Sequence, residues 1–273
     1  MSMRGEVAIA ISALLMSTVS IFVRNINADA ITVTFLRFST AFLFISIFML
    51  IIQQKPMIKE FKPIILLSIF NVSTVICYIS AIQSLEVATA ALLLYMAPIY
   101  VLPIAYVSGE RIELKTWIAL PLGILGLYLM LSPYATISIG LILGVLSGVS
   151  YALVFYTSKI ARRKHNPFEI NFYTLMFGSL VLLPYFILNP IKDNIFWIFG
   201  LGLIPTAIPF VLFTYGIKYV RVQVAPILAL LEPLSATIIG YIVFKEVLTF
   251  KQIIGAILIL TSTFIAWSER EKL

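Results

Sequence analysis

Long apolar stretches, each close to twenty residues, recur along the whole chain and leave only short segments between them. A helix that crosses a bilayer needs about 20 such residues, at a rise of about 1.5 Å each. Of the 273 residues 61% are hydrophobic, against about 45–50% in soluble domains. We therefore expect an all-α membrane protein with ten transmembrane helices, over residues 7–23, 31–52, 63–83, 87–107, 117–131, 137–159, 168–188, 195–217, 223–244 and 253–267.

The second half of the chain repeats the first at an offset of 135 residues. This offset pairs Gly5 with Gly140, Ile82 with Ile217, Val87 with Val222, Ala90 with Ala225, Leu93 with Leu228, Pro98 with Pro233 and Tyr106 with Tyr241. One further residue of shift pairs Glu110 with Glu246 and Lys115 with Lys251. We expect two five-helix repeats, residues 1–134 and 135–273. Five is odd, so the second repeat starts on the opposite side, and the repeats are inverted around a central cavity, an architecture of transporters.

The basic residues fall mainly on one side of this predicted topology. With a cytoplasmic N-terminus, fourteen of the nineteen Lys and Arg residues lie in inside segments. Outside segments hold Arg24, Lys192, Lys245 and Lys251. This asymmetry predicts cytoplasmic N- and C-termini in a multi-pass protein of the cell membrane. The net charge of +7 is thus explained by topology and lipid headgroups, and no nucleic-acid partner is expected. The first apolar run imitates a signal peptide, but its place in the repeat predicts a retained helix.

Each predicted repeat contains a proline-broken fourth helix that ends in a short charged motif. The stretches run from Ala97-Pro98 to Gly109-Glu110 and from Glu232-Pro233 to Lys245-Glu246, with glycines in each following helix at Gly123, Gly126 and Gly255. In these features the whole chain resembles the EamA-type transporters of the drug/metabolite transporter superfamily. The resemblance implies secondary transport of small metabolites, often amino acids, and favours export across the cytoplasmic membrane. It implies no particular substrate.

Glu232 is an ionisable residue near the middle of the ninth predicted helix, where the other repeat has Ala97. Ionisable groups at that depth are rare and usually functional. A carboxyl group there can carry a proton across the membrane or bind an amine. It can instead satisfy backbone groups that Pro233 leaves unpaired. We predict that Glu232 binds substrate and couples protons, and both roles are compatible with the structural one.

Arg37 is a basic residue within the second predicted helix. A guanidinium group is suited to a substrate carboxylate, because it offers a planar pair of donors. The alternative is that Arg37 extends to the outer interface or pairs with Glu86 or Asp29. Further candidates for the substrate site are polar side chains inside spans, which need a partner or water there: Asn71 and Thr206, which occupy equivalent repeat positions, and Tyr78, Tyr95, Tyr151 and Tyr215.

Prolines inside the spans predict where the helices bend. Each removes a backbone donor and disturbs the preceding turn. We expect hinges at Pro98, Pro103, Pro205, Pro209, Pro226 and Pro233. Bends at paired positions would give each repeat a similar moving element, so that access can alternate between the two sides.

Other function classes lack the residues they require. One histidine, His165, and one cysteine, Cys77, leave little for metal, redox or hydrolytic chemistry, so we expect no enzyme, metal site or cofactor. A channel would need a continuous polar pore. The sequence predicts a transporter of small metabolites that works as a single chain, because both repeats are present. Exchange of phosphorylated sugars or nucleotide sugars remains an alternative, as does export of cationic drugs through Glu232.

Overall fold

The computed structural model describes residues 3–57, 59–82, 84–85, 87–131, 139–191, 194–245 and 247–268, all of them helical or in short connections. Glu86, Glu246, Lys192 and the first residues of the predicted 137–159 helix lie outside the described residues. The elements are α1 (Met3–Ser17), α2 (Val19–Val23), α3 (Ala30–Ile51), α4 (Phe61–Ile82), α5 (Val87–Tyr95), α6 (Ala97–Val107), α7 (Leu114–Leu131), α8 (Ile139–Ala161), α9 (Pro167–Leu188), α10 (Ile195–Gly202), the π-helix η1 (Leu203–Ala207), α11 (Ile208–Gly216), α12 (Ala225–Leu228), α13 (Leu231–Phe244) and α14 (Phe250–Trp267).

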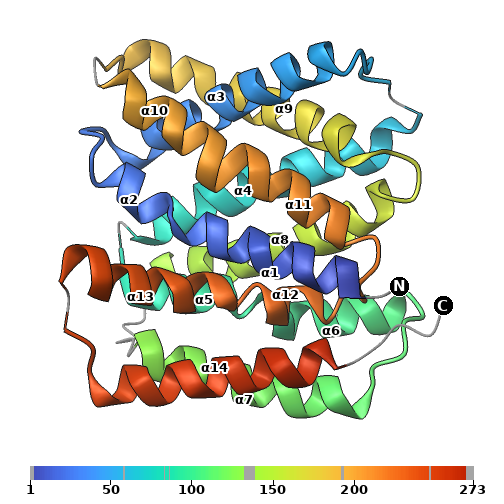
Figure 1. The fold of residues 1–273 in the computed structure, drawn as a ribbon, viewed down its shortest axis with the longest axis vertical. Coiled ribbons are helices and arrows are strands. Elements are labelled where there is room, and N and C mark those ends of the chain that lie inside the picture. The colour runs from blue at the N-terminus through green and yellow to red at the C-terminus, as the bar shows by residue number, and fades with distance from the viewer. Residues whose placement is uncertain are drawn as a thin grey trace.

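These elements form ten helical spans that are long and apolar enough to cross a membrane. The prediction of an all-α membrane protein with ten transmembrane helices in two repeats is confirmed. Six spans are single helices, and four are composite: α1–α2, α5–α6, α10–η1–α11 and α12–α13. The start of α1 and the end of α14 lie on the same side of the bundle (Figure 1), as ten crossings require. We call this side the terminal side and the opposite side the far side.

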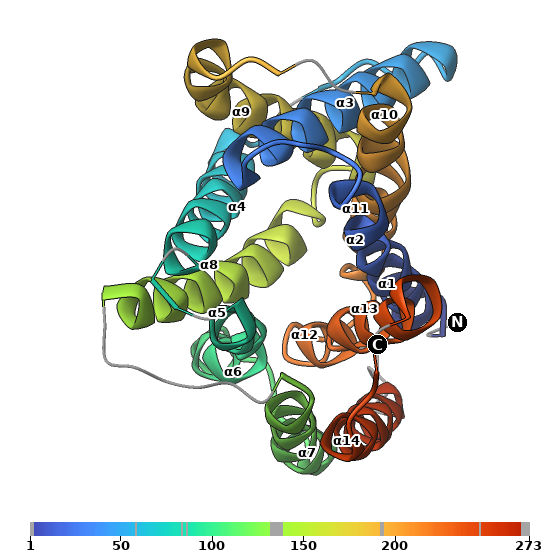
Figure 2. The same cartoon turned by 90° about the vertical axis from the view of Figure 1, so that its left-hand side faces the viewer.

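The two halves pack through equivalent helix pairs. The first span of each half lies against the third span of the other, which gives the pairs α1 with α11 and α8 with α4. The second spans pack against each other as α3 with α9, and the fifth as α7 with α14. Viewed from the far side, these pairs surround a central region that α5 and α12 approach (Figure 2). The halves therefore interlock instead of forming two separate bundles.

Glycine contacts show the repeat symmetry at the level of single atoms. A Cβ atom on Gly5 would lie 3.0 Å from the carbonyl oxygen of Gly216, and one on Gly140 would lie 3.3 Å from that of Ala81. These two contacts are related by the 135-residue offset. The fifth spans cross where Gly126 and Gly255 meet, since a Cβ atom on either would lie within 2.7 Å of the other's carbonyl oxygen. Helices approach this closely only where side chains are absent.

Two equivalent breaks interrupt the fourth and ninth spans. The fourth span breaks at Met96, directly before Ala97-Pro98, and the ninth breaks at Ala229 and Leu230, before Glu232-Pro233. Pro103 lies inside α6, and Pro226 lies in the first turn of α12. Directly after the ends of α6 and α13 come Gly109 and Lys245, whose φ angles of 78° and 58° are both left-handed. This shared helix ending explains why Gly109-Glu110 and Lys245-Glu246 are equivalent in the repeat.

The first span breaks at Thr18 although it contains no proline. The hydroxyl groups of Ser17 and Thr18 each donate to a backbone carbonyl oxygen three residues earlier, at 2.7 Å in both cases. Such bonds compete with the helical ladder and often bend membrane helices. Proline positions alone therefore do not predict every bend.

Candidate functional site

Arg37 extends from α3 of the first half to the π-helix η1 of the second half. Its Nε atom donates to Thr206 Oγ1 at 2.8 Å, and its Nη2 atom donates to the carbonyl oxygen of Pro205 at 3.1 Å. The guanidinium carbon lies 5.6 Å from the centre of the Phe210 ring. Asp29 instead caps the N-terminus of α3, accepting from the backbone N–H groups of Ile31 and Thr32. Arg37 is therefore held across the interface between the halves.

Two prolines four residues apart create the acceptors at η1. A proline has no N–H group and cannot donate to the carbonyl oxygen four residues earlier. Pro205 thus leaves the Leu201 carbonyl oxygen without its usual partner, and the Thr206 hydroxyl donates to that oxygen at 2.8 Å. In the same way Pro209 leaves the Pro205 carbonyl oxygen available to Arg37. Single-turn π-helices of this kind occur frequently at functional sites.

Glu232 on α13 interacts electrostatically with Arg37, although the two residues belong to different halves. The hydroxyl group of Tyr95 lies close enough to the Glu232 carboxyl group to share a hydrogen bond. Tyr78 and Tyr151 also lie near Glu232. The rings of Tyr95 and Tyr151 are 6.4 Å apart and meet edge to face. We call Arg37, Tyr78, Tyr95, Tyr151 and Glu232 the central polar cluster.

The central polar cluster is built from five helices: α3, α4, α5, α8 and α13. Each of its five side chains is half-buried, not fully enclosed. The cluster is therefore formed by convergence of the two halves, and no single helix supplies it. Arg37 and Glu232 supply opposite charges, and the tyrosines supply hydroxyl groups and aromatic faces.

The backbone near Glu232 does not depend on its carboxyl group. Pro233 leaves the Ala229 carbonyl oxygen without its usual donor, and the backbone N–H group of Glu232 occupies this acceptor at 2.9 Å. Among the described residues, no backbone group accepts a hydrogen bond from the Glu232 side chain or donates one to it. The carboxyl group is therefore directed to the cluster and not to the helix break.

One of the predicted site residues, Tyr215, lies apart from the central polar cluster. The ring of Tyr215, at the end of α11, lies 5.4 Å from that of Tyr219, and Tyr215 interacts electrostatically with Arg162 on the terminal side. Asn71 on α4 is half-buried, and no side-chain hydrogen bond of Asn71 is found among the described residues. Thr206 is fully buried and acts on the cluster through Arg37. Sequence reasoning missed Phe210, one turn after Thr206, whose ring faces the guanidinium group.

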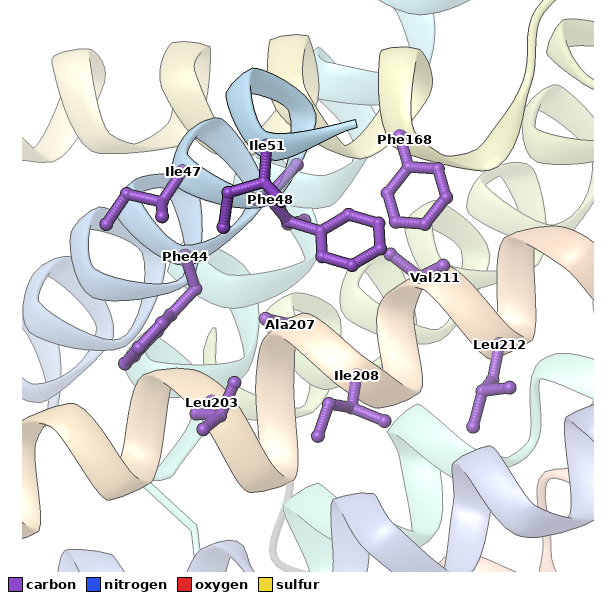
Figure 3. A pocket seen from close by; sticks show the side chains of 11 residues that line it. Phe44, Ile47, Phe48, Ile51, Phe168, Leu203, Ala207, Ile208, Val211 and Leu212 are labelled. Atoms are coloured by element: carbon purple, nitrogen blue, oxygen red, sulfur yellow. The ribbon is translucent and has the colours of Figure 1, made fainter. Parts of the chain in front are cut away.

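A separate apolar pocket of about 380 Å³ opens on the outer surface of the bundle, between α3, α9, η1 and α11. Figure 3 shows Phe48, Phe168 and Ile208 on its walls. All of its lining residues are apolar, and Ile51 and Ile208 are exposed. Such a surface suits lipid chains. Charged groups that could orient a polar substrate lie in the central polar cluster. No group of three or more metal-ligating residues occurs within the part of the chain that the structure describes.

Comparisons with known proteins agree with this architecture. The model of the EamA-like transporter family matches residues 3–132 and 138–268. An uncharacterized transporter of Archaeoglobus fulgidus is 54% identical over 265 residues, which is 97% of each chain. A pseudopaline exporter of Pseudomonas aeruginosa is 31% identical over 112 residues, covering 40% of this chain and 39% of the exporter. An S-adenosylmethionine uptake transporter of Rickettsia prowazekii is 25% identical over 193 residues, covering 68% of this chain and 65% of the relative.

A solved structure, described only as the crystal structure of a protein, superposes with a TM-score of 0.85 over 96% of each chain at 17% sequence identity. This likeness supports the fold alone. The two family matches correspond to the two halves that pack against each other in the structure.

Proposed function

Because the chain belongs to the EamA-like transporter family, we propose that it is a secondary active transporter that exports an amino acid or a related zwitterionic metabolite. One observation carries the proposal: Arg37 and Glu232 bring opposite charges from different halves into one cluster lined by tyrosines. A zwitterion presents both complementary charges in one small molecule. Inverted-repeat transporters bind their substrates at the interface of the repeats.

In this proposal, Arg37 binds the substrate carboxylate. The bonds to Thr206 and Pro205 use two of the five guanidinium donors and fix the plane of the group. The remaining donors can form a paired contact with a carboxylate, which a lysine cannot reproduce. Because the group is already oriented, little side-chain entropy is lost when substrate binds.

Glu232 binds the substrate ammonium group, and the faces of Tyr78, Tyr95 and Tyr151 are available to the rest of the molecule. Aromatic faces attract cations and pack against apolar side chains. In the substrate-free protein Arg37 and Glu232 influence each other electrostatically, and a zwitterion between them would give each group a complementary charge. A proton can replace the ammonium group on Glu232, which gives a physical basis for proton-coupled export.

The names of the relatives support a small polar substrate but leave the direction open. One relative is named an exporter of pseudopaline and another an uptake transporter of S-adenosylmethionine. Our proposal of export rests on the resemblance of the chain to its family. We further propose that the terminal side is cytoplasmic, that the protein lies in the cell membrane and that one chain is sufficient for transport.

The alternative substrates fit the cluster less well. Phosphorylated sugars and nucleotide sugars carry several negative charges, whereas Arg37 is the single cation in the central polar cluster. A cationic drug would meet Glu232, but it would also be repelled by Arg37. A zwitterion satisfies both groups at once.

A ligand series measures this preference directly. The purified protein would be screened by thermal shift with an amino acid, its decarboxylated amine and its deaminated acid, followed by counterflow in proteoliposomes. We expect the zwitterion to raise the melting temperature and to support saturable counterflow, while either single-charge analogue does neither. Stabilisation by the amine alone would favour cationic drugs. Stabilisation by a sugar phosphate would overturn the proposal.

A further inference from the structure

The carboxylate of Glu110 joins the two halves on the terminal side. Glu110 follows α6, at the point where the left-handed Gly109 ends the helix. Its Oε1 atom lies 3.1 Å from Lys159 Nζ, in the last turn of α8, and its Oε2 atom accepts from the backbone N–H group of Val222 at 3.1 Å. Lys159 also donates to the carbonyl oxygen of Val220 at 2.8 Å. Glu110 thus joins the first half to two separate elements of the second.

Neighbouring contacts strengthen the same junction. Gln223 Nε2 donates to the carbonyl oxygen of Arg111 at 3.1 Å, and Arg221 Nη1 lies 2.7 Å from Glu113 Oε1. The Glu110–Lys159 pair is the less exposed of the two ion pairs, with side-chain exposures of 25% and 14% against 39% for Glu113. Ion pairs that are sheltered and also hydrogen-bonded contribute more than exposed ones.

Below this junction the protein is packed without a gap between the halves. Val101 and Ala105 of α6 belong to one buried cluster with Val222, Val224 and the residues of α12. Helix α12 packs against α6 and α7 of the first half. The equivalent helix α5 contributes only half-buried side chains, Leu92 and Tyr95, to the cluster that includes Leu234 of α13 and Ile259 of α14. The two ends of the molecule therefore differ.

Burial shows the same difference along equivalent segments. Every residue from 224 to 230 is buried. In the equivalent segment of the first half, residues 92–95 are half-buried, although residues 89–91 are buried. A symmetric pair of repeats would show equal burial. The asymmetry indicates a state that is closed on the terminal side and looser on the far side.

We propose that Glu110 is a latch that holds the terminal side closed. Its carboxylate must leave Lys159 and the Val222 amide before α6 can separate from the segment that connects α11 to α12. When it does, the central polar cluster becomes accessible from the terminal side. Interfaces that alternate between two packed arrangements are a recurrent basis of such transitions.

Cysteine accessibility tests the latch. In a Cys77→Ser background, Ala105→Cys places a thiol at a position of zero exposure one turn before Glu110. A membrane-impermeant charged maleimide is applied to the terminal side in oriented vesicles. We expect slow reaction in the parent and an acceleration of roughly tenfold or more with Glu110→Gln, the effect of losing a hydrogen bond to a charged group. Lys159→Gln should act in the same direction, and the double variant should not exceed the larger single effect.

A second thiol separates release of the latch from general loosening. Tyr95→Cys lies in the central polar cluster and is probed from the far side. Release of the latch shifts molecules to the other state, so Glu110→Gln should slow this reaction while it accelerates that of Ala105→Cys. General destabilisation would accelerate both reactions, and that outcome would overturn the proposal.

The matched control is Glu60→Gln, which removes the same charge from an exposed pair with Lys164 on the same side. With Glu60→Gln the thiol of Ala105→Cys should react at the parent rate. An acceleration equal to that of Glu110→Gln would contradict a specific role for Glu110. If Glu110→Gln does not fold, Lys159→Gln decides the question. No substrate is used, so failure here leaves the proposed substrate class untouched.

Discussion

Thr206 accepts the Nε–H of Arg37 at 2.8 Å, and this bond links the second span of the first half to the third span of the second half. The same hydroxyl donates to the carbonyl oxygen that Pro205 leaves free. The Thr206 hydroxyl therefore both satisfies the irregular helix and orients the guanidinium group. Thr206 is a positioning residue, because in our proposal Arg37, and not Thr206, contacts the substrate.

Thr206→Val tests this positioning. The variant keeps the shape of the side chain but cannot accept the Arg37 donor. Hydrogen bonds to charged groups contribute about 1.5–3 kcal/mol, so substrate affinity should fall by about tenfold or more. Binding is measured by titration of the purified protein. The matched control is Thr214→Val, on the same span as Thr206, which loses the buried hydrogen bond that Asn171 of α9 donates to the Thr214 hydroxyl. It should lower the melting temperature without changing affinity. Equal loss of affinity in both variants would remove Thr206 from the site.

Arg37→Lys keeps the positive charge but not the planar pair of donors. A lysine cannot hold Thr206 and the Pro205 carbonyl oxygen while also presenting two parallel donors to a carboxylate. We expect affinity for the zwitterion to fall by about tenfold or more, the loss of a charge-assisted hydrogen bond. The preference for the zwitterion over its decarboxylated amine, large in the parent, should therefore shrink in the variant. If both ligands lose affinity equally, Arg37 does not bind the carboxylate.

Glu232→Gln removes titration while keeping the size and hydrogen bonding of the side chain. If Glu232 couples protons to export, the variant should lose flux driven by a pH gradient but keep counterflow exchange, which needs no net proton movement. Both are measured in proteoliposomes with the same preparation. The Ala97→Gln variant changes the equivalent repeat position and is expected to retain gradient-driven flux if it folds. Unchanged gradient-driven flux in Glu232→Gln would assign the carboxyl group a structural role.

The tyrosines of the predicted site can be separated by conservative substitutions. Tyr95→Phe removes a hydroxyl group beside Glu232, whereas Tyr215→Phe removes one beside Tyr219 and Arg162. We expect Tyr95→Phe to weaken substrate binding with little change in melting temperature. Tyr215→Phe should leave binding unchanged. If Tyr215→Phe weakens binding and Tyr95→Phe does not, the substrate site lies toward the terminal side and not at the central polar cluster.

Much of the architecture was predictable because membrane spans and internal repeats produce clear patterns over long segments of sequence. Ten apolar runs and one offset of 135 residues were sufficient for the ten-helix repeat fold. Glu232 and Arg37 could be named as candidates because ionisable residues are costly inside a span.

The partners of these residues could not be predicted in the same way. The sequence offers Asp29 and Glu86 as partners of Arg37, because both are near it in a one-dimensional topology. The structure instead pairs it with Thr206 and Pro205, about 170 residues later in the chain. Such pairing depends on how inverted halves pack, which periodicity does not encode. The position of Tyr215 differs from that of Tyr95 for the same reason, although both lie inside spans.

Asp29 gives the far side a pH-dependent contribution to stability. Partial burial raises the pKa of Asp29. Hydrogen bonds from Thr32, Ile31 and Tyr185 lower this pKa by more than burial raises it, so the net pKa lies below the ordinary value of 3.8. A lowered pKa means that the ionised form stabilises the folded state. This contribution is present above pH 3.8 and is lost as pH falls through the lower folded value.

Asp29→Asn isolates that charge, because asparagine is an equally good N-cap. We expect the variant to melt below the parent at pH 7 and the difference to shrink as pH falls below about 3.8. Asp29→Ala is the control: it loses the cap itself, at a cost of about 0.5–2 kcal/mol. If the difference in melting temperature between the parent and Asp29→Asn grows toward low pH, the pKa of Asp29 is not lowered in the folded protein.

The orientation of the chain is the last expectation to be tested. Lys164, between α8 and α9, is half-exposed on the terminal side, and Asn194, at the start of α10, is exposed on the far side. Basic residues gather on the terminal side, so this side should be cytoplasmic. In a Cys77→Ser background, Asn194→Cys should react with an impermeant maleimide added to intact cells. Lys164→Cys should react only after the membrane is opened. Removing Lys164 breaks only an exposed pair with Glu60, which contributes little to stability. Labelling of both positions in intact cells would contradict the ten-span topology, and a reversed pattern would place the termini outside.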